Sequence, residues 1–430
     1  MPRAGQLLET AFPRLQFVRF PMTNTTTSGS YIPFHVPDIG EEEINEVVDT
    51  LRSGWVTTGP RTERFESDFR EYIGCRHALA VNSGTAGLHL ALAACGIGPG
   101  DEVITTPLTF CATATVILHV GATPVLADVD ADGNIDPASI AARITPRTAA
   151  IIPVHLAGKP CNMDAIWELA RRHNLRVIED AAHAVEARYG SLTMGSPLGQ
   201  SDAVAFSFYA TKNMTTGEGG MVVTNDKLLD QNMRSLCLHG ISRDAWSRYK
   251  QNGNWFYQVL SPGFKYNMSD IQSAIGIHQL RKLERLASRR RELVELYREE
   301  LGNVAQLELP EDCTEGRHSW HLFIVRLNLD KLTIDRREFI DELNKAGVGT
   351  SVHFIPIPLH PYFARWANLS CNHCPRALAL YERILSLPLY PSLTNGQIKD
   401  ISDRVKQIVE THTRTTRRRR SAKQFSVAAL

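Results

Sequence analysis

The sequence has almost no net charge and no long hydrophobic run. It carries 47 lysines and arginines against 46 aspartates and glutamates, a formal net charge of +1. A chain so nearly neutral lacks the broad positive surface with which proteins hold nucleic acid or membranes. No stretch reaches the roughly 20 apolar residues of a membrane-spanning helix. We therefore expect no nucleic-acid partner and no membrane insertion, and any charged ligand must be held locally.

Cysteine is sparse and shows no regular pairing pattern. The eight cysteines are mostly far apart, and no secretory signal precedes them. Reduced thiols in a cytoplasmic protein are the simpler interpretation. Cys371 and Cys374 flank His373, but no second ligand pair with zinc-finger spacing accompanies them, so we predict no metal site.

The 430 residues exceed what one hydrophobic core usually serves, and no internal repeat or long low-complexity linker is present. We expect a flexible extension over 1–30, a large domain over 31–280, a small C-terminal domain over 281–412 and a basic disordered tail over 413–430. The first ~25 residues of the large domain could pack on the small one. The four consecutive arginines 417–420 are typical of a solvated surface, with an acidic partner as the alternative.

Short β-branched runs alternate with helical stretches from about residue 78 to residue 224. The runs occupy residues 77–81, 102–105, 123–128, 149–154, 175–179, 203–208 and 220–224. Strands separated by helices predict an α/β fold with a mostly parallel, seven-stranded sheet covered by helices. Ligands of such sheets bind at the carboxyl ends of the strands.

Beyond this region, apolar residues recur at helical spacing between 271 and 301 and predict a long connecting helix. Residues 320–326, 335–346 and 348–354 then indicate strand, helix and strand. Together they predict a smaller α+β domain.

Three segments of the expected sheet carry candidate chemistry. The first, residues 82–87 (NSGTAG), follows a strand and opens a helix with small residues and free N–H groups, which suits a phosphate. An ordinary strand-to-helix turn has the same composition.

The second segment, residues 179–183 (EDAAH), places Asp180 at the end of an apolar strand. A carboxylate there can receive a pyridinium N–H and so keep the ring an electron sink, which carbanion chemistry requires. Taken alone, Asp180 could equally cap a helix.

The third segment places Lys212 in a loop that follows a strand and is rich in small and hydroxyl residues. A lysine can form a Schiff base with an aldehyde and, once displaced, transfer protons as base and acid. Most lysines are solvated surface groups, but few stand between a serine-bearing strand and a glycine-rich turn. The three segments together supply the aldehyde anchor, the ring-nitrogen partner and the phosphate cradle that one cofactor needs.

On these segments the chain resembles the DegT/StrS family of nucleotide-sugar aminotransferases, which are fold-type-I pyridoxal-phosphate enzymes. The likeness runs from about residue 32 to residue 409. It rests on residues 53–60 (SGWVTTGP), 83–86 (SGTA), 109–110 (TF), 153–156 (PVHL), 179–183 (EDAAH), 207–208 (SF) with 212–213 (KN), and 263–268 (GFKYNM).

The resemblance implies a role for each matching residue. Lys212 and Asp180 match the catalytic residues, namely the Schiff-base lysine and the partner of the ring nitrogen. The other matches are cofactor contacts: Phe110 stacked on the ring, His183 beside the cofactor, and Gly84, Thr85 and Ser207 at the phosphate. The cofactor is thus expected to be pyridoxal 5'-phosphate.

Lys265 occupies a position at which many relatives have asparagine, which reaches the phosphate of the neighbouring subunit's cofactor. Lysine occurs there in the branch resembling the UDP-4-amino-4-deoxy-L-arabinose aminotransferases, which shares His239-Gly240 and Asp244-Ala245. The resemblance therefore implies a homodimer with shared active sites. A departure appears at Pro358, where a histidine is common in relatives, so substrate contacts near His353 and His360 stay open beside a purely structural role.

The function implied is transfer of an amino group from L-glutamate, which becomes 2-oxoglutarate, to a nucleotide-linked keto-sugar, most simply a UDP-4-keto-sugar. The product would serve surface polysaccharide, glycan or antibiotic biosynthesis. The alternatives are a 3-keto-sugar or cyclitol aminotransferase, or a binding or regulatory protein that retains the cofactor. Sugar deoxygenation on the same scaffold is disfavoured because those relatives replace the lysine by histidine.

Overall fold

The computed structural model describes residues 31–196, 199–242, 256–366 and 369–414. The extension predicted over 1–30 and residues 415–430 of the predicted tail lie outside the described residues. The described residues from Ile32 onward belong to one compact unit. Within the described residues, no helix is both long enough and apolar enough to cross a bilayer.

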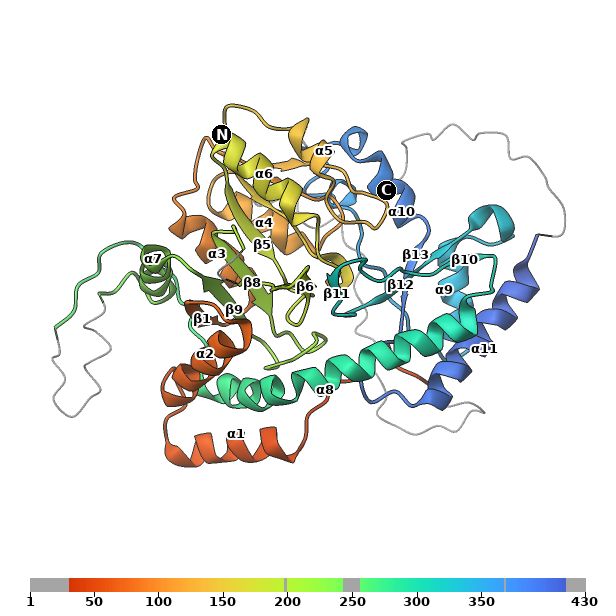
Figure 1. The fold of residues 1–430 in the computed structure, drawn as a ribbon, viewed down its shortest axis with the longest axis horizontal. Coiled ribbons are helices and arrows are strands. Elements are labelled where there is room, and N and C mark those ends of the chain that lie inside the picture. The colour runs from red at the N-terminus through yellow and green to blue at the C-terminus, as the bar shows by residue number, and fades with distance from the viewer. Residues whose placement is uncertain (1–30, 197–198, 243–255, 367–368, 415–430) are drawn as a thin grey trace, which may run out of the picture. The chain divides into compact units, whose positions relative to one another are not determined.

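A seven-stranded sheet forms the centre of this unit (Figure 1). Its strands, in spatial order, are β1 (His77–Val81), β9 (Gly220–Thr224), β8 (Ala203–Ser207), β5 (Arg176–Asp180), β4 (Thr148–Ile152), β2 (Glu102–Thr105) and β3 (Thr123–Leu126). The strands are parallel except β9, which runs antiparallel to both neighbours. This confirms the predicted α/β fold with a mostly parallel sheet.

The alternation of side chains along β1 shows why both faces of the sheet are covered. Ala78 and Ala80 face one core, which contains Phe65 and Phe69, whereas Leu79 and Val81 face another. The first core is closed by α2 (Pro60–Ile73) and α8 (Asp270–Leu301), and the second by α3 (Gly84–Ala94), α4 (Cys111–His119) and α7 (Lys227–Cys237). The remaining elements of this part are α1 (Glu41–Ser53), α5 (Pro137–Ala141), α6 (Met163–His173), and the short β6 (Arg188–Tyr189) and β7 (Leu192–Thr193).

Helix α8 confirms the long helix expected between 271 and 301, and it contributes to two cores. Gly276, in its first half, lies so close to α2 that an added Cβ would approach the Phe65 ring to 2.6 Å. Leu293, Val294 and Tyr297, in its second half, pack into a separate cluster with Ile32. The predicted boundary at residue 280 falls inside this helix, and the division into two domains stays a prediction.

The C-terminal cluster is built on a small three-stranded sheet. Its strands are β10 (Leu307–Glu308), β12 (Phe323–Leu327) and β13 (Ile384–Leu387), and its helices are α9 (Arg336–Lys345) and α11 (Asn395–His412). Also present are α10 (Pro375–Tyr381), β11 (Gly316–Arg317), which pairs with β6, and the 3₁₀ turns Leu156–Gly158, Leu329–Lys331, Ile357–Leu359 and Cys371–His373.

The strand predicted over 348–354 is wrong. Only Val348 and Ser351 form isolated bridges, to Ile32 and Ser386. The consecutive side chains of His353 and Phe354 both line one pocket, which the alternation of a regular strand does not permit. Tertiary contacts around the pocket, rather than the β propensity of this segment, therefore set its conformation.

Candidate active site

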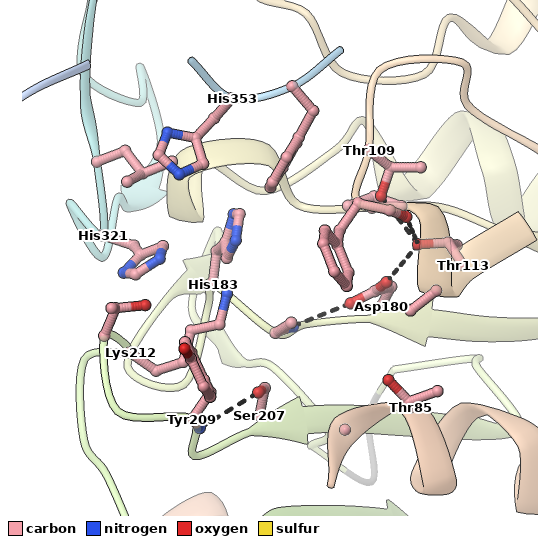
Figure 2. A pocket seen from close by; sticks show the side chains of 18 of the residues that line it. Thr85, Thr109, Thr113, Asp180, His183, Ser207, Tyr209, Lys212, His321 and His353 are labelled. Carbon is pink, nitrogen blue, oxygen red and sulfur yellow. Dashed lines mark hydrogen bonds between the residues drawn. The ribbon is translucent and has the colours of Figure 1, made fainter. Parts of the chain in front are cut away.

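Seven of the eight predicted site residues line one pocket of about 480 Å³ (Figure 2). They are Gly84, Thr85, Phe110, Asp180, His183, Ser207 and Lys212. Asp180 and Ser207 are the last residues of β5 and β8, and the other five follow β1, β2, β5 or β8. The parallel strands thus bring together residues that are more than 100 positions apart in the sequence. The pocket thus lies at the carboxyl ends of the strands, where α/β sheets hold their ligands.

The start of α3 forms one wall of the pocket. Ser83 caps the helix, its Oγ accepting a hydrogen bond from the Ala86 N–H at 3.1 Å. The N–H groups of Gly84 and Thr85 belong to the first helical turn, whose donors have no carbonyl partner within the helix. A Cβ at Gly84 would lie 3.0 Å from the Ser207 Cβ, closer than most such contacts, so glycine favours this close approach. The wall presents N–H groups and small hydroxyls, a composition that suits an anion.

Asp180 ends β5 and is 6% exposed. Its Oδ2 accepts a hydrogen bond from Thr113 Oγ1 at 2.9 Å, and its Oδ1 accepts one from the Ala182 N–H at 3.1 Å. Burial raises the pKa of Asp180, while these two donors and the charge of Lys212 oppose the rise. No helix begins in residues 181–189, directly after Asp180, so the helix-cap interpretation is wrong and the buried carboxylate needs another explanation.

Lys212 lies in the loop between β8 and β9, and Figure 2 shows it with Asp180 and His183 in one pocket. Its backbone N–H donates a hydrogen bond to the Tyr209 carbonyl at 2.9 Å. The neighbouring Asn213 side chain fixes the loop by donating to Glu186 Oε1 at 2.6 Å and to the Ser319 carbonyl at 2.9 Å. Burial lowers the pKa of Lys212 to about 8, against a smaller opposing effect of Asp180. The amine is therefore neutral far more often than that of a surface lysine.

His183 faces Lys212 among other aromatic side chains. Its ring lies 4.3 Å from the His321 ring and stacks on Phe354 at 5.7 Å, measured between centroids. Burial and then the Lys212 charge hold its pKa well below the usual value, so the imidazole is neutral. Its Nδ1 is buried and has no hydrogen-bond partner within the described residues. This atom is available to a polar group of a ligand.

Two aromatic residues of the pocket lining are exposed. Phe110 and Tyr209 line the pocket, yet they are 60% and 47% exposed. Among the described residues that line it, Lys212 is the sole lysine and there is no arginine. One chain therefore offers few cations to an anionic ligand.

Lys265 is the predicted site residue that the structure does not bring to this pocket. It is exposed, and its Nζ donates to Asn267 Oδ1 at 2.6 Å. Its carbonyl accepts from the Asn82 side chain at 3.3 Å, beside the start of α3. Lys265 thus lies outside the pocket of its own chain.

The roles of His353 and His360 were left undecided by the sequence, and the structure places only one of them in the pocket. His353 lines the pocket, its Nδ1 lies 2.8 Å from Ser386 Oγ, and burial lowers its pKa to about 3. His360 does not line the pocket and packs near Phe363. The sequence prediction missed His35, Thr113 and His321 as pocket residues. No local motif marks them.

A buried lysine and a buried carboxylate in one pocket, with a helix start in its wall, form an arrangement suited to covalent catalysis with an anionic cofactor or substrate. The family model of the DegT/DnrJ/EryC1/StrS aminotransferase family matches residues 37–406, and the chain belongs to this family. It is therefore an enzyme of the aminotransferase class.

Three relatives illustrate the similarity. A Methanocaldococcus jannaschii protein called MJ1066 is 51% identical over 381 residues, covering 88% of this chain and 98% of its own length. The spore coat polysaccharide biosynthesis protein SpsC of Bacillus subtilis is 49% identical over 382 residues, with coverages of 88% and 97%. The solved structure of the putative sugar aminotransferase Spr1654 from Streptococcus pneumoniae, in a PLP-form, superposes with a TM-score of 0.81 at 34% identity and covers 89% of this chain and 99% of its own. A PMP-form of that protein has also been solved.

Proposed function

We propose that this chain is a pyridoxal-phosphate-dependent sugar aminotransferase that moves an amino group from L-glutamate to the ketone of a nucleotide-linked sugar. The observation that carries the proposal is the convergence of Lys212, Asp180 and the start of α3 on one pocket. The family membership and the sugar aminotransferase and polysaccharide relatives support the sugar substrate.

The described residues fit pyridoxal phosphate at each of its polar groups. Gly84 leaves room beside Ser207 for the phosphate to reach the N–H groups of α3. Asp180, held on both oxygens, would pair with a protonated ring nitrogen. The unpartnered Nδ1 of His183 would meet a further polar substituent of the ring, and Phe110 would cover its face.

When bound, the cofactor supplies an electron sink for the carbon that bears the amino group. Lys212 would hold the cofactor's aldehyde carbon covalently and release it when the substrate's amine takes its place. In each half of the reaction the freed Nζ can then act first as a base, accepting a proton from the carbon on one side of the transferred nitrogen, and then as an acid, returning it to the carbon on the other side. The lowered pKa of Lys212 suits both roles near neutral pH.

The test is a panel of nucleotide keto-sugars that differ in the nucleotide and in the position of the ketone, offered with L-glutamate and followed by mass spectrometry. We expect amination of a UDP-4-keto-sugar with release of 2-oxoglutarate. The branch resemblance of His239, Gly240 and Lys265 supports this choice; Asp244 and Ala245 of the same pattern lie outside the described residues. Amination of only a 3-keto-sugar would identify that sugar as the substrate instead, and amination of only a keto-cyclitol added to the panel would identify a cyclitol aminotransferase. A cofactor-bound protein whose visible spectrum does not respond to glutamate would indicate a binding role.

The loading of cofactor onto apoenzyme should accelerate as pH rises to about 8 and then level off. Only the neutral amine of Lys212 attacks the aldehyde, and below a pKa of about 8 the neutral fraction falls tenfold per pH unit. Stopped-flow absorbance gives the rate constant, and a lysine peptide measured in parallel corrects for titration of the cofactor itself. If the rate constant kept rising as the pH approached 10.5, the ordinary pKa of a lysine, the lowered pKa of Lys212 would be contradicted.

We also propose that the enzyme is a homodimer with shared active sites. Glutamate, the cofactor phosphate and a nucleotide are all anionic, while the described lining of one pocket contains Lys212 and no arginine. Further cations must then come from elsewhere, and Lys265 is exposed beside the start of α3. The exposed Phe110 and Tyr209 would be covered in the same dimer.

The eight unpaired cysteines support the predicted cytoplasmic location.

Mixed dimers test this sharing. Inactive, folded Lys212→Ala subunits combined with inactive, folded Lys265→Glu subunits should regain activity, because one site of each mixed dimer then has both residues intact. With random pairing, about a quarter of the wild-type activity per subunit should return. A mixture of Lys212→Ala with Lys212→Arg is the matched control and should stay inactive. If mixed dimers demonstrably form and remain inactive, Lys265 does not serve the neighbouring site.

A further inference from the structure

Two buried threonine hydroxyls form a chain of hydrogen bonds that ends at the Asp180 carboxylate (Figure 2). Thr113, in the first turn of α4, is 1% exposed, and Thr109, just before that helix, is 2% exposed. Thr109 Oγ1 lies 2.9 Å from Thr113 Oγ1, which lies 2.9 Å from Asp180 Oδ2. Asp180 is thus the end of a short hydroxyl chain inside the pocket wall.

The directions of these hydrogen bonds follow from counting protons. An ionised carboxylate only accepts, and each hydroxyl has a single proton to donate. Thr113 therefore donates to Asp180, and Thr109 donates to Thr113. The other oxygen of Asp180 accepts the Ala182 N–H, so both oxygens are held by donors.

A protonated Asp180 would fit this arrangement poorly. If its proton lay on Oδ2, Thr113 would have to accept it and turn its own proton to the Phe110 carbonyl, 3.3 Å away. Thr113 would then exchange a donated hydrogen bond of 2.9 Å to the carboxylate for a longer one to that carbonyl, while Thr109 could still donate to the second lone pair of Thr113 Oγ1. The hydroxyl chain therefore favours the ionised carboxylate and opposes the effect of burial.

We propose that Thr113, oriented by Thr109, is a positioning residue that keeps Asp180 ionised and aimed at the ring nitrogen of the bound cofactor. This inference rests on the proposed function. The charged and titratable groups that also face Asp180 are Lys212, from the loop after β8, and His155, from the segment after β4. His155 is itself engaged, with Nε2 at 2.8 Å from Glu179 and Nδ1 accepting the Cys161 N–H. Thr113 is the side chain that binds the carboxylate directly.

A structural role for Thr113 is the competing explanation, and α4 provides a matched control. Thr115 lies two residues further along α4 and donates to the Cys111 carbonyl at 2.8 Å, without a hydrogen bond to Asp180. Thr113→Val and Thr115→Val remove the same atom from the same helix. Thr113→Ser keeps the hydroxyl and should restore wild-type behaviour.

The experiment measures binding of pyridoxamine 5'-phosphate to apoenzyme by calorimetry, since this ligand forms no covalent bond to Lys212. We expect Thr113→Val to weaken binding roughly tenfold, as expected for a hydrogen bond to a charged group, and Thr115→Val to leave it unchanged. An analogue whose ring nitrogen is replaced by carbon should show no such difference between wild type and Thr113→Val. With ¹⁵N-labelled ligand, the ring-nitrogen resonance should shift toward the neutral form in Thr113→Val and return in Thr113→Ser.

Each outcome discriminates. Equal affinity and an unchanged ¹⁵N resonance in Thr113→Val, with a wild type that binds well, would overturn the role of Thr113 alone. Equal weakening with the carbon analogue would show a structural effect and overturn it too. A wild type that binds neither ligand would overturn the proposed function. If Thr113→Val does not fold, Thr109→Val carries the test, with a smaller ¹⁵N shift in the same direction expected.

Discussion

Replacing Lys212 by alanine should lower turnover by at least about 10³-fold, because one substitution removes both the amine that holds the cofactor and the base that transfers the proton. The structure gives Nζ no substitute: among the described residues that line the pocket, Lys212 is the sole lysine, and the histidines beside it are held neutral by burial. The effect should appear in kcat, measured with saturating cofactor and keto-sugar.

Two variants separate lost chemistry from lost structure. Lys212→Arg keeps the positive charge but offers no amine of suitable pKa, and it should be as inactive as Lys212→Ala. Small primary amines added to Lys212→Ala should restore part of the proton transfer, because the removed side chain leaves space in the pocket. Undiminished single-turnover amination by purified Lys212→Ala would remove the central claim.

The sequence predicted the sheet well because its strands are buried on both faces and read as continuous apolar runs. The bounds of β1, β2 and β9 coincide with the predicted ones. The run at 123–128 was predicted too long, since β3 lies at the sheet edge and its pairing with β2 stops at Leu126. Strand ends are set by the neighbouring strand, which the local sequence does not contain.

Elements that depend on distant partners escaped prediction. β11 is two residues long and exists because Gly316 and Arg317 pair with Tyr189 and Arg188, more than 120 positions earlier. The segment 348–354 has strand-like composition but turns two neighbouring side chains into the pocket. In both cases tertiary contacts decide the local conformation.

Some residues of the candidate site could likewise be predicted from local sequence motifs, and others could not. Lys212, Asp180 and Gly84 stand in motifs whose chemistry is visible in a few consecutive residues. Thr113 carries no such mark, because a threonine in an apolar helix looks structural and its partner Asp180 is 67 positions away. The geometry of the folded chain is what reveals its contact with the carboxylate.

Replacing Asp180 by asparagine should lower kcat by about 10³-fold while the protein stays folded. Two unit charges about 4 Å apart near a protein surface interact by about 4 kcal/mol, and the buried carboxylate would lose this interaction with the protonated ring. Folding should survive, because burial raises the pKa of Asp180 and thus makes its ionised form less favourable in the folded protein than in the unfolded chain. Above that pKa, asparagine removes this cost, and Thr113 can turn its proton to the Phe110 carbonyl to accept the new amide N–H.

Asp128→Asn is the matched control for the loss of a buried carboxylate. Asp128 is 5% exposed and accepts hydrogen bonds from the Arg376 and Ala377 N–H groups at the start of α10, away from the pocket. We expect Asp128→Asn to change thermal stability but to leave kcat within about twofold of wild type, because it touches no reacting group. For Asp180→Asn we expect the reverse pattern, with a near-normal melting temperature and a collapsed kcat. A near-normal kcat in Asp180→Asn would show that the carboxylate only holds the turn at Ala182, and the ring-nitrogen role would then have to be abandoned.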